Sequence, residues 1–403
     1  MHAPDEQAPA KQAADKQAPD EQAFRAEVRD WLSANLSGEF APLVGSGGPG
    51  REHEFIEQRM AWERRLGADG WIGIGWPVSA GGRGLPWSHQ VIFYEEYARA
   101  GAPARVGHMG EQLLGPTLLM FGTAEQRGRF LPGILAGTQL WCQGYSEPGA
   151  GSDLAAVATR ARLDGGEWHV DGQKVWTSLA QFADWCFVLA RTEPAAQRHR
   201  GLSYLLVPMR QPGIEVRPIV QLTGTAEFNE VFFDDARAAA GDVVGVPGDG
   251  WRVAMGTLAV ERGVSTFGQQ LGFQREFDAV LVTARSTGAL EDPDIAARIA
   301  EAWVGLQVMR YTALAALDRP AADVPGAEVS INKLIWGTWH QRLGELAVDV
   351  AGAAATVVGA GYDLDNAQRL FLYTKADTIY GGSAEIQRNV IAERLLGLPR
   401  EAR

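Results

Sequence analysis

Cysteine and histidine are scarce in this sequence, and their scarcity argues against several classes of site. Cys142 and Cys186 are the only two cysteines, too few for a disulfide framework and without the spacing of metal ligands. The seven histidines are scattered and show no paired ligand pattern. We therefore expect no metal site, and a protein of the reducing cytoplasm.

Long hydrophobic runs and excess positive charge are also missing. The longest run of small apolar residues, Val350–Ala360, is too short to cross a bilayer. The 37 Lys and Arg are outnumbered by 49 Asp and Glu, for a formal net charge of -12. This balance argues against a nucleic-acid partner and an anionic membrane surface, although a phosphorylated substrate needs only a local basic patch.

The chain does contain enough apolar material for more than one core. It has 403 residues, of which 46% are hydrophobic, and this length predicts two or three domains. Residues 1–22 are different, because they form a near-repeat of polar residues, Ala and Pro. Such a segment cannot bury enough apolar surface to offset the entropy of ordering, so we predict a disordered tail.

The character of the sequence changes twice after this tail. Residues 23–139 have the periodicity of amphipathic helices, and residues 247–403 return to long helical patterns. Between them, residues 140–246 contain short strands separated by Gly-rich turns, which predicts a small antiparallel domain. This order differs from βαβ alternation, and it therefore argues against a Rossmann sheet. The string at 45–50 fits G-x-G-x-x-G, but no strand or helix flanks it, so a loop is the better interpretation.

Two short segments of the β-rich region carry the chemistry. They are Tyr145–Asp153, which reads YSEPGAGSD, and Lys174–Ser178, which reads KVWTS. A Pro-Gly-x-Gly-Ser turn alone is usually only a turn. Together, however, the segments combine hydroxyls, an indole and glycines that let backbone N–H groups approach a ligand. A flavin needs donors for its N5/O4 edge, a flat apolar wall and N–H groups for its pyrophosphate.

These segments closely resemble the acyl-CoA dehydrogenase flavoprotein family, which is also matched before and after them. The matching strings are Gly75–Gly84 with Glu95–Gly101, Tyr145–Asp153, and Ile379–Asn389. The resemblance covers nearly everything after the tail. It implies an α+β fold with an N-terminal helical domain, a central β-barrel domain and a C-terminal four-helix bundle. FAD would lie between the β domain and the bundle, with its adenine end reaching a neighbouring subunit.

The resemblance also assigns roles to individual residues. Ser146 and Ser178 would donate to the flavin N5/O4 edge, and Trp176 would wall the isoalloxazine, although Trp176 could also be a simple core residue. The remaining positions assigned by motif are Ser152, Ser383, Glu385 and Arg285 for the cofactor, and Ser152, Arg262 and Tyr380 for the substrate.

The sequence departs from the commonest family pattern at the catalytic position. Many members carry the base as Glu in a Tyr-Glu-Gly-Thr string, where this chain reads Tyr380-Gly381-Gly382-Ser383. Gly381 cannot take a proton, but its backbone N–H can donate to a thioester oxygen. Relatives resembling isovaleryl-CoA and long-chain dehydrogenases carry the base on a bundle helix just before an Arg, and Glu261 matches that place. A helical Glu that merely pairs with a nearby Arg is the alternative for Glu261.

Two further family segments are missing. The Arg-x-x-Phe-Gly motif is reduced to Arg285 as a possible remnant, and residues 350–354 stand where Gln-x-x-Gly-Gly is expected. In lacking these segments, the chain resembles the branch of the family in which two different subunits share one flavin. A dimer or tetramer of identical chains is the ordinary family assembly, and a heterotetramer is the alternative.

The function implied by the resemblance is FAD-dependent α,β-dehydrogenation of an acyl thioester, carried by CoA or by an acyl-carrier protein. Electrons would pass to an electron-transfer flavoprotein. Two alternatives remain open: a flavin-dependent oxidase or monooxygenase on the same fold, and a non-catalytic subunit that lends FAD contacts to a catalytic homologue. The sequence does not indicate the length, branching or ring content of the acyl group.

Overall fold

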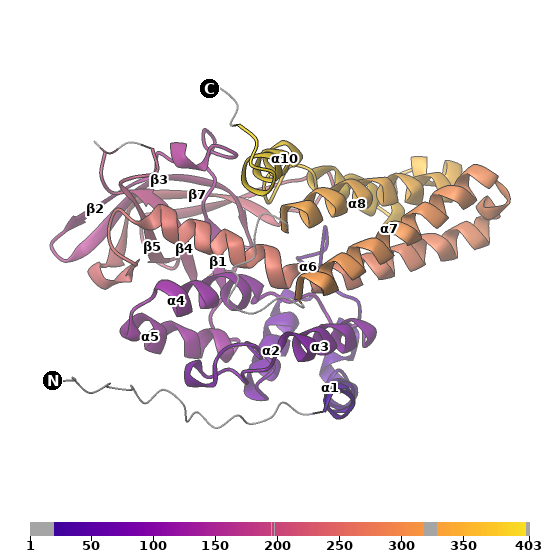
Figure 1. Cartoon of the computed structure of the whole chain (residues 1–403), viewed down its shortest axis with the longest axis horizontal. Coiled ribbons are helices and arrows are strands. Elements are labelled where there is room, and N and C mark those ends of the chain that lie inside the picture. Colours follow the sequence, from indigo (N-terminus) through magenta and orange to yellow (C-terminus); the bar gives the residue numbers. More distant parts are fainter. Residues whose placement is uncertain (1–19, 195, 197, 318–328, 400–403) are drawn as a thin grey trace, which may run out of the picture.

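A computed structural model describes residues 20–194, 196, 198–317 and 329–399, without the side chains of 260–268, 316, 317 and 329. The described elements form a helical block, a β block and a second helical block in chain order (Figure 1). The three-domain architecture implied by the resemblance is therefore confirmed.

The N-terminal block begins at Glu21 because Asp20 caps the first helix. The Asp20 carboxylate accepts the backbone N–H groups of Gln22 at 3.0 Å and Ala23 at 3.1 Å. The predicted tail, 1–22, is thus two residues too long, and its residues 1–19 lie outside the described part of the chain. The helices of this block are α1 (Glu21–Asn35), α2 (Ile56–Ala68), α3 (Trp87–Arg99), α4 (Gly115–Phe121) and α5 (Ala124–Leu135), with a π-helical turn at Met109–Leu114.

The β block is an eight-stranded sheet in the order β6-β7-β3-β2-β4-β5-β8, with β1 paired to β4. Its strands are β1 (Trp141–Gly144), β2 (Arg160–Asp164), β3 (Glu167–Ser178), β4 (Trp185–Arg191), β5 (Leu202–Pro208), β6 (Ile214–Ile219), β7 (Phe228–Ala239) and β8 (Val243–Val244). The prediction of antiparallel pairing is wrong at two places, because β1 and β2 both run parallel to β4. Strand β3 lies between these strands in the chain and supplies the long connection that a parallel pair requires.

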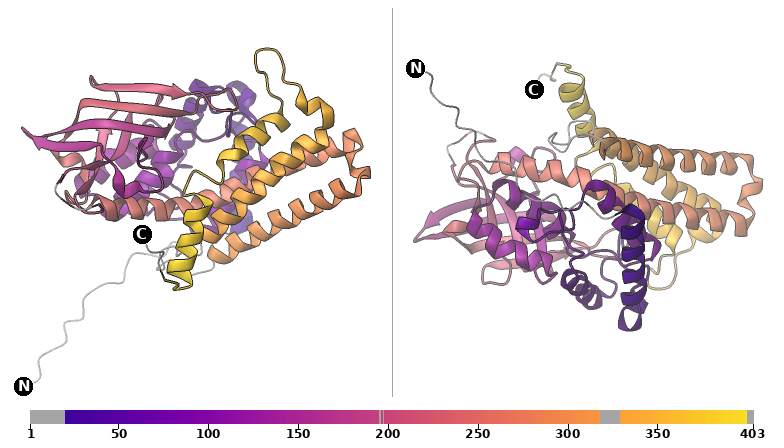
Figure 2. Two further views of the ribbon diagram at one scale, coloured as in Figure 1. Left: turned by 90° about the horizontal axis from the view of Figure 1, so that it is seen from above. Right: turned by 60° about the horizontal axis from the view of Figure 1, so that its bottom comes forward.

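The C-terminal block is a bundle built on one long helix. Helix α6 (Gly250–Thr287) has 38 residues, and its first turns lie along the sheet before it enters the bundle (Figures 1 and 2). At about 1.5 Å per residue, this helix is about 57 Å long. The other helices are α7 (Pro293–Leu317), α8 (Val329–Ala351), α9 (Asn366–Tyr373) and α10 (Ala384–Val390), and a short 3-10 helix, η8 (Thr374–Ala376), follows α9.

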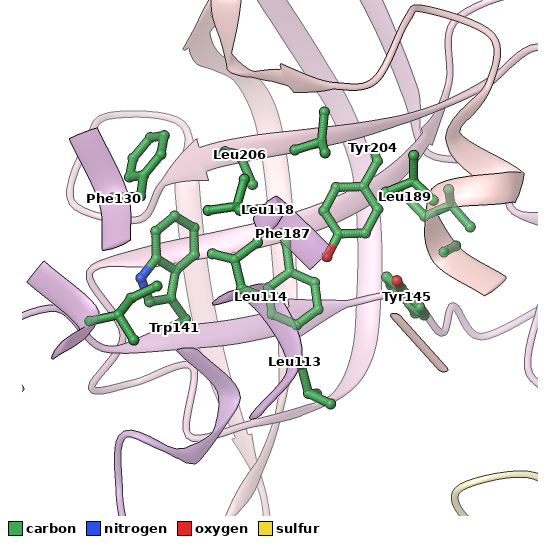
Figure 3. Close-up of a cluster of buried hydrophobic side chains, with 14 of the residues drawn as sticks. Leu113, Leu114, Leu118, Phe130, Trp141, Tyr145, Phe187, Leu189, Tyr204 and Leu206 are labelled. Atoms are coloured by element: carbon green, nitrogen blue, oxygen red, sulfur yellow. The ribbon is translucent and has the colours of Figure 1, made fainter. Parts of the chain in front are cut away.

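One hydrophobic core joins all three blocks (Figure 3). Phe187 and Tyr204 on neighbouring strands stack with their ring centroids 5.7 Å apart and their planes within 2°. Around them lie side chains of the N-terminal helices, the strands and the start of α6: Leu113, Leu114, Leu118, Phe130, Trp141, Leu206, Val253 and Ala254. Because this core is shared, packing of the sheet also fixes where α6 leaves it.

We expect Phe187→Ala to lower the free energy of unfolding by about 3–5 kcal/mol, because it opens a cavity in this shared core. Chemical unfolding followed by tryptophan fluorescence measures the loss. Leu163→Ala is the matched control, since Leu163 lies on β2 with 53% of its surface exposed. An equal loss in both variants would contradict the placement of the core.

Candidate functional site

The segment Tyr145–Asp153 lies against strand β3, which brings the two motifs of the sequence together. The Val175 N–H donates to the Ser146 carbonyl oxygen at 2.9 Å. The next residues form a tight turn in which Glu147 and Ala150 exchange two backbone hydrogen bonds of 3.0 Å. The glycine-rich loop is therefore held at both its entry and its first turn.

A buried ion pair between Lys174 and Glu147 fixes this loop against β3. The Lys174 ammonium is fully buried and donates to Glu147 Oε1 at 2.7 Å, to the Tyr145 carbonyl at 3.0 Å and to the Leu189 carbonyl at 2.7 Å. The three acceptors use all three of its protons. Glu147 in turn accepts the backbone N–H groups that open the run to β2, from Ala158 at 2.6 Å and Thr159 at 2.9 Å.

The pKa values of both Lys174 and Glu147 are shifted. Burial lowers the pKa of Lys174, and the Glu147 carboxylate opposes that shift. Burial alone would raise the pKa of Glu147, but the Lys174 charge and the hydrogen bonds it receives bring that pKa below its usual value. Only the ammonium form of Lys174 can donate to all three acceptors, so the hydrogen-bond geometry is that of a charged pair.

Trp176 lies on the opposite side of the same strand. The β3–β7 register is interrupted between Lys174 and Thr177, and Trp176 has a φ of 61° within this bulge. A bulky residue in the left-handed region is strained. The bulge leaves Trp176 57% exposed, and its ring meets Phe228 edge-on with the ring centroids 6.3 Å apart. The interpretation of Trp176 as a core tryptophan is thus wrong, because Lys174 and Thr177 occupy the buried positions.

The groups beside this indole suit a flavin. The hydroxyls of Ser146 and Ser178 have no hydrogen-bond partner within the residues that the structure describes, and both side chains are half-buried. A Cβ at Gly149 or Gly151 would meet nothing within 4 Å, so the backbone of this loop is open to a ligand. An exposed indole, two available donors and an open glycine backbone together fit FAD. Ser152 is exposed in the same loop.

The second candidate segment is the turn between η8 and α10. Gly381 and Gly382 have φ values of 63° and 86°, and their carbonyl oxygens accept from Gln387 Nε2 at 3.2 Å and 3.1 Å. Their N–H groups have no partner among the described residues, so Gly381 can donate to a ligand. The Ser383 hydroxyl caps α10 by accepting the Ile386 N–H at 3.4 Å.

The β block and the bundle also contact each other through polar groups. Glu227 accepts the Leu179 N–H directly after the Ser178 position. Burial raises the pKa of Tyr373 in the bundle, and the charges of Asp377, Glu52 and Glu227 raise it further. The Tyr362 hydroxyl also donates to the Leu222 carbonyl at 2.6 Å.

The remaining predicted site residues are not gathered in one place. Glu385 is exposed and pairs with Arg388 at 3.5 Å. Arg285 is exposed near the end of α6, 24 residues or about 36 Å along the helix from position 261. Glu261 and Arg262 lie on α6, but their side chains are outside those that the structure describes.

Sequence reasoning missed the structural role of Glu147 and Lys174. The available signal was a lysine inside an alternating strand, in register with a glutamate in the preceding turn. No group of three His, Cys, Asp or Glu able to hold a metal occurs in the described residues. Within the same residues, no helix is both long and apolar enough to cross a membrane.

Comparison with known proteins gives matches along most of the chain. Models of the acyl-CoA dehydrogenase N-terminal, middle and C-terminal domains match residues 18–138, 142–236 and 248–396. Acyl-CoA dehydrogenase IpdE1 of Mycobacterium tuberculosis (strain ATCC 25618 / H37Rv) is 63% identical over 380 residues, covering 94% of this chain and 98% of that protein. IpdE1 of Mycolicibacterium smegmatis (strain ATCC 700084 / mc(2)155) is 60% identical over 390 residues, covering 94% and 98%.

Two solved structures share the fold. The Tcur3481-Tcur3483 steroid ACAD has a TM-score of 0.81 and 31% identity, with 94% of this chain and 98% of that chain covered. The ChsE4-ChsE5 complex from Mycobacterium tuberculosis has a TM-score of 0.78 and 29% identity, with 96% and 100% covered.

We expect Lys174→Met to lower the free energy of unfolding by about 3–5 kcal/mol, because it leaves the Glu147 carboxylate buried without its counter-charge. FAD binding should weaken with it, since the loop loses its anchor. Thermal unfolding and flavin fluorescence measure the two effects. Lys375→Met is the control, because the Lys375–Glu345 pair is exposed. Normal flavin affinity in Lys174→Met would contradict the anchoring role.

Proposed function

Because this chain belongs to the acyl-CoA dehydrogenase family of FAD-dependent oxidoreductases, we propose that it converts an acyl-CoA to the trans-2-enoyl-CoA with Glu261 as the base. The observation that carries this proposal is the joining of the glycine-rich loop to β3 beside the exposed Trp176. That arrangement supports a flavin site in the region predicted from the motifs.

The proposed FAD contacts follow from the donors and the open surface of this region. The Ser146 and Ser178 hydroxyls would donate to the flavin edge, and the Trp176 indole would cover its ring. Ser152, Ser383 and Glu385 are assigned to its phosphates or ribose, and Arg285 to the flavin of a neighbouring subunit. When bound, FAD supplies at N5 the acceptor of the hydride that leaves the β-carbon.

The proton of the α-carbon needs a separate acceptor, which we assign to the Glu261 carboxylate. The turn that carries a glutamate in many relatives has Gly381 here, so it offers a backbone N–H for the thioester oxygen instead of a base. In this assignment Glu261 takes the proton and the Gly381 N–H stabilises the developing enolate. Arg262 and Tyr380 would contact the substrate.

We take the thioester carrier to be CoA, and a basic cluster beside Ser152 suits its phosphates. Arg198 pairs with Asp153 at 2.6 Å, and His199 packs on Trp251 with ring centroids 4.5 Å apart. Arg198, His199 and Arg200 are all exposed, and cations at this place suit the phosphates of CoA.

For the acyl group we propose a bulky ring system derived from a steroid. A base carried by a helix approaches the α-carbon from a different backbone position than a base carried by the turn. The structurally similar Tcur3481-Tcur3483 protein is a steroid ACAD. The physiological electron acceptor is proposed to be an electron-transfer flavoprotein.

We further propose that the working assembly pairs this chain with a different, homologous subunit. The chain lacks the Arg-x-x-Phe-Gly and Gln-x-x-Gly-Gly segments, and the similar ChsE4-ChsE5 structure is a complex of two components. A homodimer or homotetramer with one FAD per chain is the competing arrangement.

Glu261→Gln should retain flavin but slow its reduction by acyl-CoA by about a hundredfold or more, because the amide cannot accept the α-proton. Anaerobic stopped-flow bleaching measures this rate. Asp278→Asn is the control, since Asp278 is exposed on the same helix. Unchanged bleaching in Glu261→Gln would place the base elsewhere, and rapid reoxidation of the wild type by oxygen would favour an oxidase.

The assembly proposal predicts half an FAD per chain in a complex that contains both subunits. Light scattering gives the mass, and absorbance of the released flavin gives the ratio. One FAD per chain in a complex of identical subunits would contradict a shared site.

A further inference from the structure

A buried row of polar groups connects α6, α8 and the turn at 380–383. His340 on α8 has Nε2 2.6 Å from Glu276 Oε2 on α6, and Nδ1 2.7 Å from Asp377 Oδ2. The other oxygen of Asp377 accepts the Tyr380 hydroxyl at 2.6 Å. The row thus runs from the outer side of α6 to the residue that begins the turn.

The geometry fixes the charge state of the row. Both ring nitrogens of His340 face carboxylate oxygens, and ionised carboxylates only accept, so both nitrogens must carry protons. His340 is 2% exposed and Asp377 is 0% exposed, while the Phe273 ring lies 4.3 Å from the imidazole. The result is an imidazolium enclosed between two carboxylates in the interior of the bundle.

The charge balance accounts for the titration of this group. Burial alone lowers the pKa of His340, but Glu276 and Asp377 outweigh it and raise the pKa from 6.5 to about 9. Burial, Tyr373 and Asp377 raise the pKa of Tyr380 as well, so its hydroxyl remains a donor.

Asp377 is also bound through its backbone carbonyl, so it connects α8 with the turn by two separate contacts. Lys333 on α8 donates to the Asp377 carbonyl oxygen, and its ammonium lies 4.9 Å from the centre of the Tyr380 ring. The adjoining Gly381 and Gly382 adopt left-handed backbone conformations. The turn is therefore held at two places: Gln387 on α10 binds the two glycine carbonyl oxygens, and Asp377 with Tyr380 holds the residue that begins the turn.

We propose that His340 is a positioning residue that holds the 380–383 turn, through Asp377 and Tyr380, in the conformation that presents the Gly381 N–H to a ligand. What the turn binds rests on the proposed function, but its ordering by His340 does not. Apolar side chains of similar volume could stabilise the bundle equally well. The charged row differs from such packing because its hydrogen bonds are directional and reach the turn.

This role makes the turn sensitive to pH in one direction. The groups that face the row are Glu276 from α6, Lys333 from α8, Tyr373 from α9, and Asp377 with Tyr380 from the turn segment. A group whose pKa is raised on folding contributes stability that is complete below its unfolded pKa. That contribution is lost as pH rises through the folded pKa of about 9, when one carboxylate of the row loses its donor.

Hydrogen exchange tests the ordering of the turn without flavin or substrate. In His340→Gln at pH 7, amides of 377–387 should exchange at least tenfold faster than in the wild type, since an amide side chain cannot donate in both directions. Leu343→Ala is the matched control, because Leu343 is 1% exposed one turn further along α8. It should speed exchange in α8 and change the turn less than twofold.

Ligand binding supplies the second measurement, made on the full chain together with its partner subunit if it has one. Because Ser383, which is assigned to FAD, lies in the same turn, His340→Gln and Tyr380→Phe should each raise the FAD dissociation constant about tenfold. The double variant should bind FAD no more weakly than the weaker-binding single variant, because both substitutions remove the same chain of hydrogen bonds. In the wild type the constant should rise between pH 7.5 and 9.5, and in His340→Gln it should stay flat over that range.

Two results would overturn the proposal. One is turn exchange in His340→Gln no faster than in Leu343→Ala, and the other is independent, multiplying effects of His340→Gln and Tyr380→Phe. If His340→Gln does not fold, Tyr380→Phe and the pH dependence of the wild type give the same decision. Faster exchange without dehydrogenase activity in the wild type would refute the proposed function and leave the positioning role intact.

Discussion

The ion pair between Lys174 and Glu147 is the interaction on which the candidate site depends. It places a full charge in the interior of the sheet domain and satisfies it completely, with one carboxylate and two backbone carbonyls. Loss of either partner would leave the other buried and unpaired, so the loop has one stable position against β3. The hydroxyls and glycines of the loop can then face outward without having to hold the loop in place.

The bundle shows the same separation between buried groups that fix the backbone and outward-facing groups that have no partner among the described residues. His340 and Asp377 are buried and face inward, whereas the Gly381 and Gly382 N–H groups are left for a ligand. In both segments, buried charges help to fix irregular backbone, together with hydrogen bonds from β3 to the loop and from α10 to the turn. Such an arrangement costs desolvation energy, but it gives direction to groups that apolar packing would leave free to rotate.

Trp176 shows how a strained backbone position can expose a large side chain. Its left-handed backbone conformation interrupts the β3–β7 register, and the bulge turns a large indole outward. The buried side of the same strand is completed by Lys174 and Thr177. A regular strand would keep strict alternation with no extra residue, so the bulge allows the anchor and the indole to lie two residues apart on opposite sides.

The sequence by itself determined the order of the three domains and the positions of the motifs, because helical periodicity, strand alternation and glycine-rich turns are local properties. It also showed that Gly381 cannot be the base. Tertiary structure decided which side of β3 Trp176 occupies and that β1 and β2 run parallel to β4. It alone brought Glu276, His340 and Asp377 together, because these residues come from segments 37 to 101 residues apart. Contacts over such separations depend on packing of the whole chain, which no local pattern encodes.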